Sequence, residues 1–253
     1  MDLGLRDKRA IITGATKGIG RQILELLIAE GCNVATCSRS IEDVEACIEK
    51  ASTRKAQVYG DVCDIRDQEE YAAWIDKMVE QMDGVDIFIP NVSAGGGMDS
   101  EKNWWKNFEA DVLGTVRGVE AVIPHMKENG GGAITMIGTT ASLETFAGPQ
   151  AYNALKASLY TYSKQLGQFH GHDGIRCNIV SPGPIEFPGG SWDMIRDTIP
   201  KFYEKTLRDH PTGRLGKPQE VAKAVVFLSS PAASWCNGSN LVVDGGFTKG
   251  VHF

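Results

Sequence analysis

At residues 9–20 the sequence reads Arg9-Ala-Ile-Ile-Thr13-Gly14-Ala15-Thr16-Lys17-Gly18-Ile19-Gly20, an apolar run that leads directly into a glycine-rich turn. The apolar run predicts a buried strand, and the pattern after it predicts a helix. The three glycines permit a tight turn and a close approach of the backbone, so amide N–H groups and the helix start can hold a pyrophosphate. The alternative is a plain strand-to-helix connection, but the flanking strand and helix favour a dinucleotide site.

The same alternation of apolar runs and amphipathic stretches continues to the end of the chain, which is typical of successive βαβ units. We predict one Rossmann-type, doubly wound α/β domain over residues 1–253, with a seven-stranded parallel sheet flanked by helices. Strands are expected at 8–13, 33–37, 56–60, 85–89, 133–137, 175–180 and 240–243. Helices are expected at 19–30, 41–51, 68–82, 101–128, 150–170 and 218–229. Residues 187–211 have no strand partner, and we expect them to form a substrate lid.

Composition excludes several classes of function. The net charge is −6 with scattered Lys and Arg, so nucleic acid is not an expected partner. The chain has no apolar run of about 18 residues, and its start is short and charged, so we expect a cytoplasmic protein without a membrane span. Its six cysteines form no C-x-x-C pair and have no metal-ligand spacing with histidines, so we expect reduced thiols and no metal site.

The end of the second expected strand bears on the choice of cofactor. An Asp or Glu there would repel the 2′-phosphate of NADP, whereas Arg39 can pair with it and Ser38 can hydrogen-bond it. Lys17 adds a second positive charge, so the sequence favours NADP(H) over NAD(H). The alternative is that Arg39 is a solvated loop charge. Asp61 and Val62, after the third strand, are placed for the adenine edge, although an Asp at a strand end is also a common helix cap.

Tyr152 and Lys156 lie four residues apart, and this spacing places both on one face of a helix. An ammonium beside a phenol favours the phenolate and lowers a pKa that is ordinarily about 10, toward the range of a general acid or base. Taken alone, the pair is also compatible with a Tyr ring packed beside a Lys stem. The remainder of the chain decides between the two interpretations.

With the glycine turn, Tyr152, Lys156 and Asp244-Gly-Gly together, the chain resembles the short-chain dehydrogenase/reductase family over nearly its full length. The resemblance implies that Tyr152 is the general acid/base, and that Lys156 holds the nicotinamide ribose and lowers the pKa of Tyr152. It places Thr139 where the family has the Ser that polarises the substrate carbonyl, with Thr140 and Ser142 as competitors. It places Asp111 where the family has an Asn that holds a water in a proton relay.

The resemblance also implies contacts with the cofactor and the substrate. Asn91 is expected on the adenosine side, and Ile185, in the Pro182-Gly183 turn, is expected to contact the nicotinamide carboxamide through its backbone. Phe187 stands where the family often has a Thr, and a phenyl is expected to line the substrate cavity instead. The expected substrate-binding residues are Ser142, Phe146, Phe187, Trp192 and Met194, with Met98 nearby. The alternative is a lid that buries its own side chains.

The function expected from these features is NADP(H)-dependent carbonyl reduction or alcohol oxidation on a small, apolar or aromatic ketone or alcohol. One alternative is reduction of a 3-oxoacyl thioester on an acyl carrier protein, although residues 124–129 and 168–174 offer little positive charge to an acidic partner. Another is a nucleotide-sensing or scaffold protein without chemistry. Helices at 101–128 and 150–170 are long enough to pack against copies of themselves, so a homotetramer is expected, as in the family.

Overall fold

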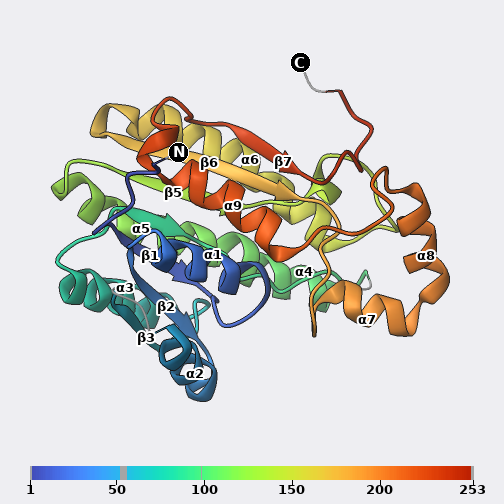
Figure 1. Cartoon of the computed structure of the whole chain (residues 1–253), viewed down its shortest axis with the longest axis horizontal. Coiled ribbons are helices and arrows are strands. Elements are labelled where there is room, and N and C mark those ends of the chain that lie inside the picture. The colour runs from blue at the N-terminus through green and yellow to red at the C-terminus, as the bar shows by residue number, and fades with distance from the viewer. Residues whose placement is uncertain (1, 52–55, 98, 252–253) are drawn as a thin grey trace.

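A computed structural model describes residues 2–51, 56–97 and 99–251. Within these ranges the chain forms one parallel sheet of seven strands in the order β3-β2-β1-β4-β5-β6-β7, with helices on both faces (Figure 1). The predicted seven-stranded parallel sheet is therefore confirmed. The strands are β1 (Arg9–Thr13), β2 (Asn33–Ser38), β3 (Val58–Val62), β4 (Ile87–Ile89), β5 (Gly132–Ile137), β6 (Ile175–Pro182) and β7 (Asn240–Val243).

The helices follow the predicted periodicity with two differences. The described α-helices are α1 (Gly18–Ala29), α2 (Ile41–Ala51), α3 (Gln68–Met82), α4 (Glu101–Asn107), α5 (Gly114–Glu128), α6 (Ala151–His170), α7 (Ser191–Thr198), α8 (Pro200–Asp209) and α9 (Pro218–Ser229). The single helix expected over 101–128 is divided by a π-helical turn, Phe108–Leu113. The expected lid segment, 187–211, contains α7 and α8, which extend beyond the sheet on one side of the molecule (Figure 1).

Alternate residues of the strands supply two cores, one on each face of the sheet. In β1, Ala10 and Ile12 join the core covered by α1 and α9, whereas Ile11 faces the core covered by α3, α5 and α6. Such a strand is buried on both sides, which explains why it reads as a continuous apolar run. Within the described ranges, none of the helices combines the length and apolar character that crossing a membrane requires.

The strand order positions the site. The sheet grows outward in both directions from β1 and β4, so the connections after these two strands diverge and leave a crevice at their carboxyl ends. Asn91, just after β4, spans this point: its Nδ2 donates to the carbonyls of Thr13 (3.0 Å) and Gly14 (3.1 Å). The glycine turn and the end of β4 are therefore held together where a ligand is expected.

Candidate active site

A cavity of about 670 Å³ opens at the carboxyl edge of the sheet, where several distant segments of the chain meet. The sequence-predicted residues that line it are Gly14, Thr16, Lys17, Gly18, Ile19, Gly20, Ser38, Arg39, Asn91, Thr139, Phe146, Tyr152, Lys156, Pro182, Gly183, Ile185, Phe187 and Trp192. The fold thus brings together most of the residues that the sequence assigned to a nucleotide and to a reacting carbonyl. Among the described residues, no group of three or more His, Cys, Asp or Glu is arranged to hold a metal ion.

The glycine turn has the shape that a pyrophosphate needs. Gly14 and Gly18 have φ of +69° and +57°, and a Cβ on Gly20 would lie 2.4 Å from the Asn91 amide nitrogen and 2.6 Å from the Gly14 carbonyl oxygen. Side chains at these positions would be strained or would collide with the backbone. Helix α1 begins next to this turn without a side-chain cap, so its first amide groups remain available to an anion. The turn therefore fits a dinucleotide.

The adenosine end of the cavity differs from the prediction. Asp61 pairs with Lys77 of α3, Val62 is 42% exposed, and neither lines the cavity. The wall is formed by the residues that follow directly, Cys63, Asp64, Ile65 and Arg66. Because β3 continues to Val62, Asp61 remains in the strand, and the following residues turn into the crevice. The assignment of Asp61 and Val62 is corrected to this segment.

Two cations from different segments lie near each other at this end. Arg66 makes a bidentate contact with Asp64, with Nε 3.0 Å from Oδ1 and Nη2 2.5 Å from Oδ2. Arg66 first and Arg39 to a lesser extent hold the pKa of Asp64 below its ordinary value. The side chain of Arg39 is therefore close to this pair, and Lys17 lines the same cavity from the glycine turn. Sequence reasoning missed Arg66 because no motif distinguishes it from a surface Arg.

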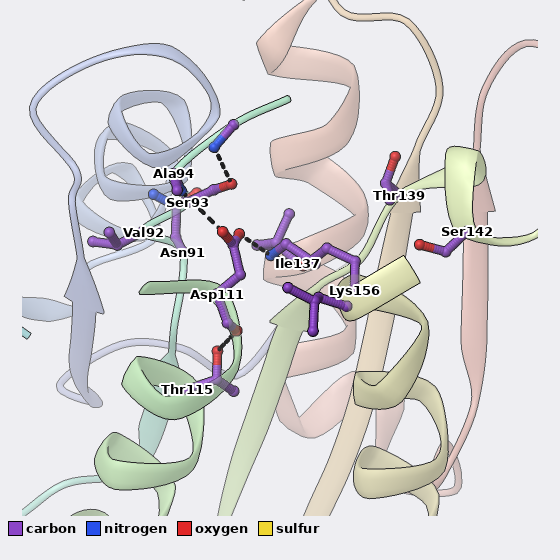
Figure 2. A network of polar contacts seen from close by, with 12 residues as sticks. Asn91, Val92, Ser93, Ala94, Asp111, Thr115, Ile137, Thr139, Ser142 and Lys156 are labelled. Atoms are coloured by element: carbon purple, nitrogen blue, oxygen red, sulfur yellow. Dashed lines mark hydrogen bonds and ion pairs between the residues drawn. The ribbon is translucent and has the colours of Figure 1, made fainter. Parts of the chain in front are cut away.

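Lys156 and Asp111 form a buried ion pair in the centre of the site (Figure 2). The Lys156 Nζ lies 3.2 Å from Asp111 Oδ1 and donates to the Ile137 carbonyl at 2.9 Å. Asp111 Oδ2 accepts the Ala94 N–H at 3.0 Å, whereas Oδ1 faces the ammonium without a well-aligned hydrogen bond. The side chain of Asp111 is 0% exposed and that of Lys156 is 3% exposed. Asp111 therefore holds Lys156 and the loop after β4 in place.

The π-helical turn explains how Asp111 reaches this position. In this turn the Gly114 N–H donates to the carbonyl of Glu109, five residues earlier, so the helix widens there. The Asp111 carbonyl accepts the Thr115 hydroxyl instead, at 2.9 Å (Figure 2). Pattern reasoning predicted a continuous helix because a widened turn keeps nearly the same apolar periodicity.

The hydroxyl groups after β5 have distinct partners. Thr140 Oγ1 donates to the Pro182 carbonyl at 3.2 Å, and Ser142 Oγ donates to the Asn153 carbonyl at 2.6 Å. Thr139 Oγ1 accepts the Ala141 N–H at 3.2 Å, and the same hydroxyl also hydrogen-bonds the phenol of Tyr152. Of these three, Thr139 is the one whose hydroxyl lies both on the cavity wall and beside Tyr152. Ser142 does not line the cavity, and its expected substrate contact is corrected.

Tyr160, which no sequence pattern indicated, fixes the backbone of Thr139. Its hydroxyl accepts the Thr139 N–H at 3.2 Å, donates to the Thr139 carbonyl at 2.7 Å and lies 2.9 Å from Ser181 Oγ. Ser181 Oγ in turn donates to Asn240 on β7 at 2.6 Å. The end of β5 is thus tied to α6 and to the last two strands of the sheet.

The pKa of Tyr152 is raised above its ordinary value. Burial disfavours the phenolate most, and the negative charge of Asp111 adds to this effect. Hydrogen bonding by the Thr139 hydroxyl acts in the opposite direction, which places that hydroxyl beside the phenol. The ammonium of Lys156 is paired with Asp111, which offsets part of its charge. In this structure Tyr152 is therefore held as a protonated phenol.

Aromatic side chains form the other part of the wall. Phe187 packs over the glycine turn, since a Cβ on Gly18 would lie 2.6 Å from its ring. Trp192 and Phe146 line the cavity as expected, and they are joined by Phe202 and Phe247, which the sequence did not single out. Met194 is 60% exposed on α7 and does not line the cavity, which corrects the expectation for this residue. Met98 lies outside the described residues.

Comparison with known proteins identifies the family. Residues 14–248 match the family model described as "Enoyl-(Acyl carrier protein) reductase". Isoepoxydon dehydrogenase from Penicillium expansum is 31% identical over 256 residues, covering 99% of this chain and 98% of the relative.

Two solved structures show the same fold and carry different cofactors. A 7α-hydroxysteroid dehydrogenase in complex with NADH and 7-oxoglycochenodeoxycholic acid has a TM-score of 0.90 and 29% identity, with coverage of 99% and 98%. L-Sorbose reductase from Gluconobacter frateurii in complex with NADPH and L-sorbose has a TM-score of 0.91 and 27% identity, with coverage of 99% and 100%. The chain belongs to the short-chain dehydrogenase/reductase family, and it is a nicotinamide-dependent oxidoreductase that acts on a CH–OH or C=O group.

Proposed function

We propose that this protein is an NADP(H)-dependent carbonyl reductase or alcohol dehydrogenase that acts on a small, apolar or aromatic ketone or alcohol. The observation that carries the proposal is the arrangement of Thr139, Tyr152 and Lys156 on one cavity wall, beside a glycine turn shaped for a dinucleotide. The relatives named above are dehydrogenases and reductases, which agrees with this chemistry.

The chain's own residues divide the reaction among them. A bound NADPH would supply the hydride to the carbonyl carbon. Tyr152, held as a protonated phenol, donates its proton to the substrate oxygen, and the Thr139 hydroxyl beside it donates a hydrogen bond that stabilises the developing charge on that oxygen. Lys156 would hold the nicotinamide ribose, and its ammonium stabilises the phenolate that the proton transfer leaves. Asp111 fixes the position of Lys156.

The preference for NADP(H) rests on charge at the adenosine end. Lys17, Arg39 and Arg66 all line the cavity there, and a 2′-phosphate is the group of NADP(H) that such cations distinguish from a hydroxyl. The single acid in this part of the wall, Asp64, is already paired with Arg66. We therefore place the 2′-phosphate beside Arg39 and Ser38.

A carbonyl panel assayed with both cofactors tests the proposal. Purified protein is mixed with NADPH or NADH and with cyclic, aromatic and acyclic ketones, and oxidation of the cofactor is followed by absorbance. We expect turnover with NADPH and a higher kcat/KM for apolar ring ketones. Tight cofactor binding without turnover across the panel would refute the proposal and favour the nucleotide-sensing alternative.

A second candidate is reduction of a 3-oxoacyl thioester on an acyl carrier protein; the description of the matching family model names an enoyl reductase, which shares the carrier but reduces a different bond. Against it, Lys127 at the end of α5 is paired with Asp173 at 2.8 Å, which reduces the positive charge available to an acidic carrier protein. Titration with acyl carrier protein separates the two functions, because only a carrier-dependent enzyme should show saturable turnover with the carrier-bound substrate.

We also propose a homotetramer. Helices α4 and α6 pack against each other, and they expose large apolar side chains: Trp104 is 42% exposed, Trp105 59% and Phe169 70%. Apolar groups of this size on neighbouring helices suit contact with a second copy of the chain. Sedimentation velocity measures the assembly directly, and a monomer at all concentrations would contradict the proposal.

A further inference from the structure

Four aromatic rings meet at one end of the cavity. They come from the loop between β5 and α6, from the lid segment 187–211 and from the chain after β7. The ring of Phe146, between β5 and α6, has centroid distances of 6.0 Å to Trp192 of α7, 5.6 Å to Phe202 of α8 and 5.8 Å to Phe247, after β7. Trp192 and Phe202 are stacked, with 9° between their planes. All four line the cavity and remain partly exposed, so they present ring surface to its interior.

This aromatic wall lies next to the reacting groups. The carbonyl of Phe146 accepts a hydrogen bond from Asn153 Nδ2 at 3.4 Å, and Asn153 follows Tyr152 directly on α6. Because the four rings line the same cavity as Tyr152 and Thr139, a ring bound against the wall can present its carbonyl to these two hydroxyls. The two hydroxyls supply the polar end of the site and the four rings supply its apolar end.

Phe247 belongs to a short segment, Asp244–Lys249, which we call the C-terminal strap. Gly245 and Gly246 have φ of +63° and +81°, so the chain turns sharply after Asp244. The Asp244 carboxylate closes this turn by accepting the N–H groups of Gly246 (2.9 Å) and Thr248 (2.8 Å) and the Thr248 hydroxyl (2.6 Å).

Two further contacts fix the strap against the site. The carboxylate of Glu144, which lines the cavity, accepts the Lys249 N–H at 3.2 Å. The ring of Phe247 stacks on His210, with a centroid distance of 5.3 Å and 25° between the planes. Phe247 is thus held between His210 and Phe146, and the Asp244-Gly-Gly motif explains how a residue near the chain end reaches the substrate region.

Charge restricts what this end of the cavity can bind. The described lining residues of this region are Glu144, Thr145, Phe146, Ala147, Gln150, Asn153, Trp192, Ile195, Phe202, Phe247 and Thr248. They include one acid and no Lys or Arg; Lys106 also lines the cavity, where it donates to the Ala94 carbonyl at 3.1 Å. A carboxylate or phosphate held against the four rings would find no cation among the residues of this region, whereas a neutral apolar ring would replace water on the aromatic surfaces.

We propose that Phe247, positioned by the C-terminal strap, is a specificity-determining residue that binds a neutral, apolar ring of the substrate together with Phe146, Trp192 and Phe202. The inference rests on the proposed carbonyl reductase function and narrows its substrate class to ring ketones and the corresponding alcohols.

The test compares acetophenone with 2-octanone, an acyclic ketone of the same carbon number, in NADPH-dependent reduction by the wild type, Phe247→Ala and Phe247→Leu. We expect the wild type to favour acetophenone. Phe247→Ala should raise the KM for acetophenone by about tenfold, because one aromatic contact is lost. The KM for 2-octanone should change less than about threefold. Phe247→Leu, which keeps apolar volume without a ring, should show the same selective effect even if the alanine variant folds poorly.

Trp235→Ala is the control, because this exposed indole does not line the cavity and should leave both KM values unchanged. Suppose that the wild type reduces both ketones and that both Phe247 variants have the same ratio of the two KM values as the wild type. The ring subsite is then refuted while the reductase function stands. If the wild type reduces neither these ketones nor others, and the affinity for NADPH is normal, both proposals fail.

Discussion

At the residue scale, the pairing of Asp111 with Lys156 bears on the pKa of Tyr152, the residue that we propose as the proton donor. An amide at position 111 would leave the Lys156 ammonium without its carboxylate partner, whereas the carboxylate offsets that charge and adds to the rise in the pKa of Tyr152 that burial causes. The protonated phenol is the form that donates a proton to a carbonyl.

The variant Asp111→Asn tests this effect. Removing the negative charge should lower the pKa of Tyr152, so the loss of reductase activity with rising pH should begin at lower pH. Alcohol oxidation, which needs the phenolate, should appear at lower pH for the same reason. The free energy of unfolding should fall by about 3 kcal/mol because Lys156 keeps only a weaker partner. The measurements are pH profiles of kcat/KM in both directions and urea unfolding.

Glu109→Gln is the matched control for Asp111→Asn. Glu109 lies on the same π-helical turn but is exposed, so its charge is screened by solvent. Its pH profile should match that of the wild type. Identical profiles for Asp111→Asn and the wild type would show that Asp111 does not tune Tyr152.

Arg39→Asp tests the cofactor preference. An acid at this position repels the 2′-phosphate and can accept hydrogen bonds from ribose hydroxyls, so the ratio of kcat/KM for NADPH over NADH should fall by on the order of 100-fold. Turnover with NADH should be retained. An unchanged ratio, measured with one ketone at saturation, would remove Arg39 from the account of cofactor choice.

The sequence could predict those site residues whose chemistry depends on spacing or on backbone shape. Tyr152, Lys156 and the glycine turn were found in this way, and all line the cavity. Asp61 was wrong because the point at which a strand leaves the sheet depends on its pairing with β2, which a pattern of residue types does not show. Tyr160 and Phe247 were missed because their contacts join segments distant in the sequence.

At the element scale, the helices between the strands were predictable because each buries one face on the sheet. The π-helical turn was not, since its six residues are too few to show a periodicity of their own. The two helices of the expected lid segment were also missed, because their amphipathic stretches are short and carry many charged residues. Both unpredicted features border the site.

Helix α9 provides a prediction on stability. Glu220, in the first turn of α9, accepts the Lys217 N–H at 2.8 Å and pairs with Arg214 at 2.7 Å. Hydrogen bonding by Arg214, and then by the Lys217 N–H, lowers the pKa of Glu220 to about 2. A carboxyl whose pKa is lowered by folding stabilises the fold above its unfolded pKa of about 4.3, and this contribution is lost as pH falls toward 2.

Glu220→Gln should therefore lower the free energy of unfolding at pH 7 by about 1 kcal/mol, a value that allows for solvent screening of a partly exposed pair. The difference from the wild type should shrink as pH decreases below about 4. Urea unfolding at a series of pH values measures it. A difference that stays constant with pH would show that the carboxylate charge is not the source of the stability.

At the scale of the whole molecule, the parallel sheet explains why residues as distant as Gly14, Asn91, Thr139 and Pro182 share one cavity. Each follows or ends a strand, and the carboxyl ends of parallel strands lie at one edge. The seven-stranded parallel sheet was predictable from the alternation of elements together with the family resemblance. The substrate end was not, because α7, α8 and the C-terminal strap have no partner in the sheet.

We propose that Tyr152 transfers a proton during a nicotinamide-dependent reduction. Tyr152→Phe tests this role most directly, because it removes the hydroxyl that would carry the proton. The variant loses only the phenol hydroxyl, and Tyr162→Phe, on the same helix but outside the cavity, is the matched control. The measurement is NADPH oxidation by each variant with a ketone that the wild type reduces, together with the Kd for NADPH. We expect Tyr152→Phe to lose at least about 1,000-fold in kcat while its Kd for NADPH stays unchanged, and Tyr162→Phe to keep full activity. A Tyr152→Phe variant that retains wild-type turnover would contradict the proposed role.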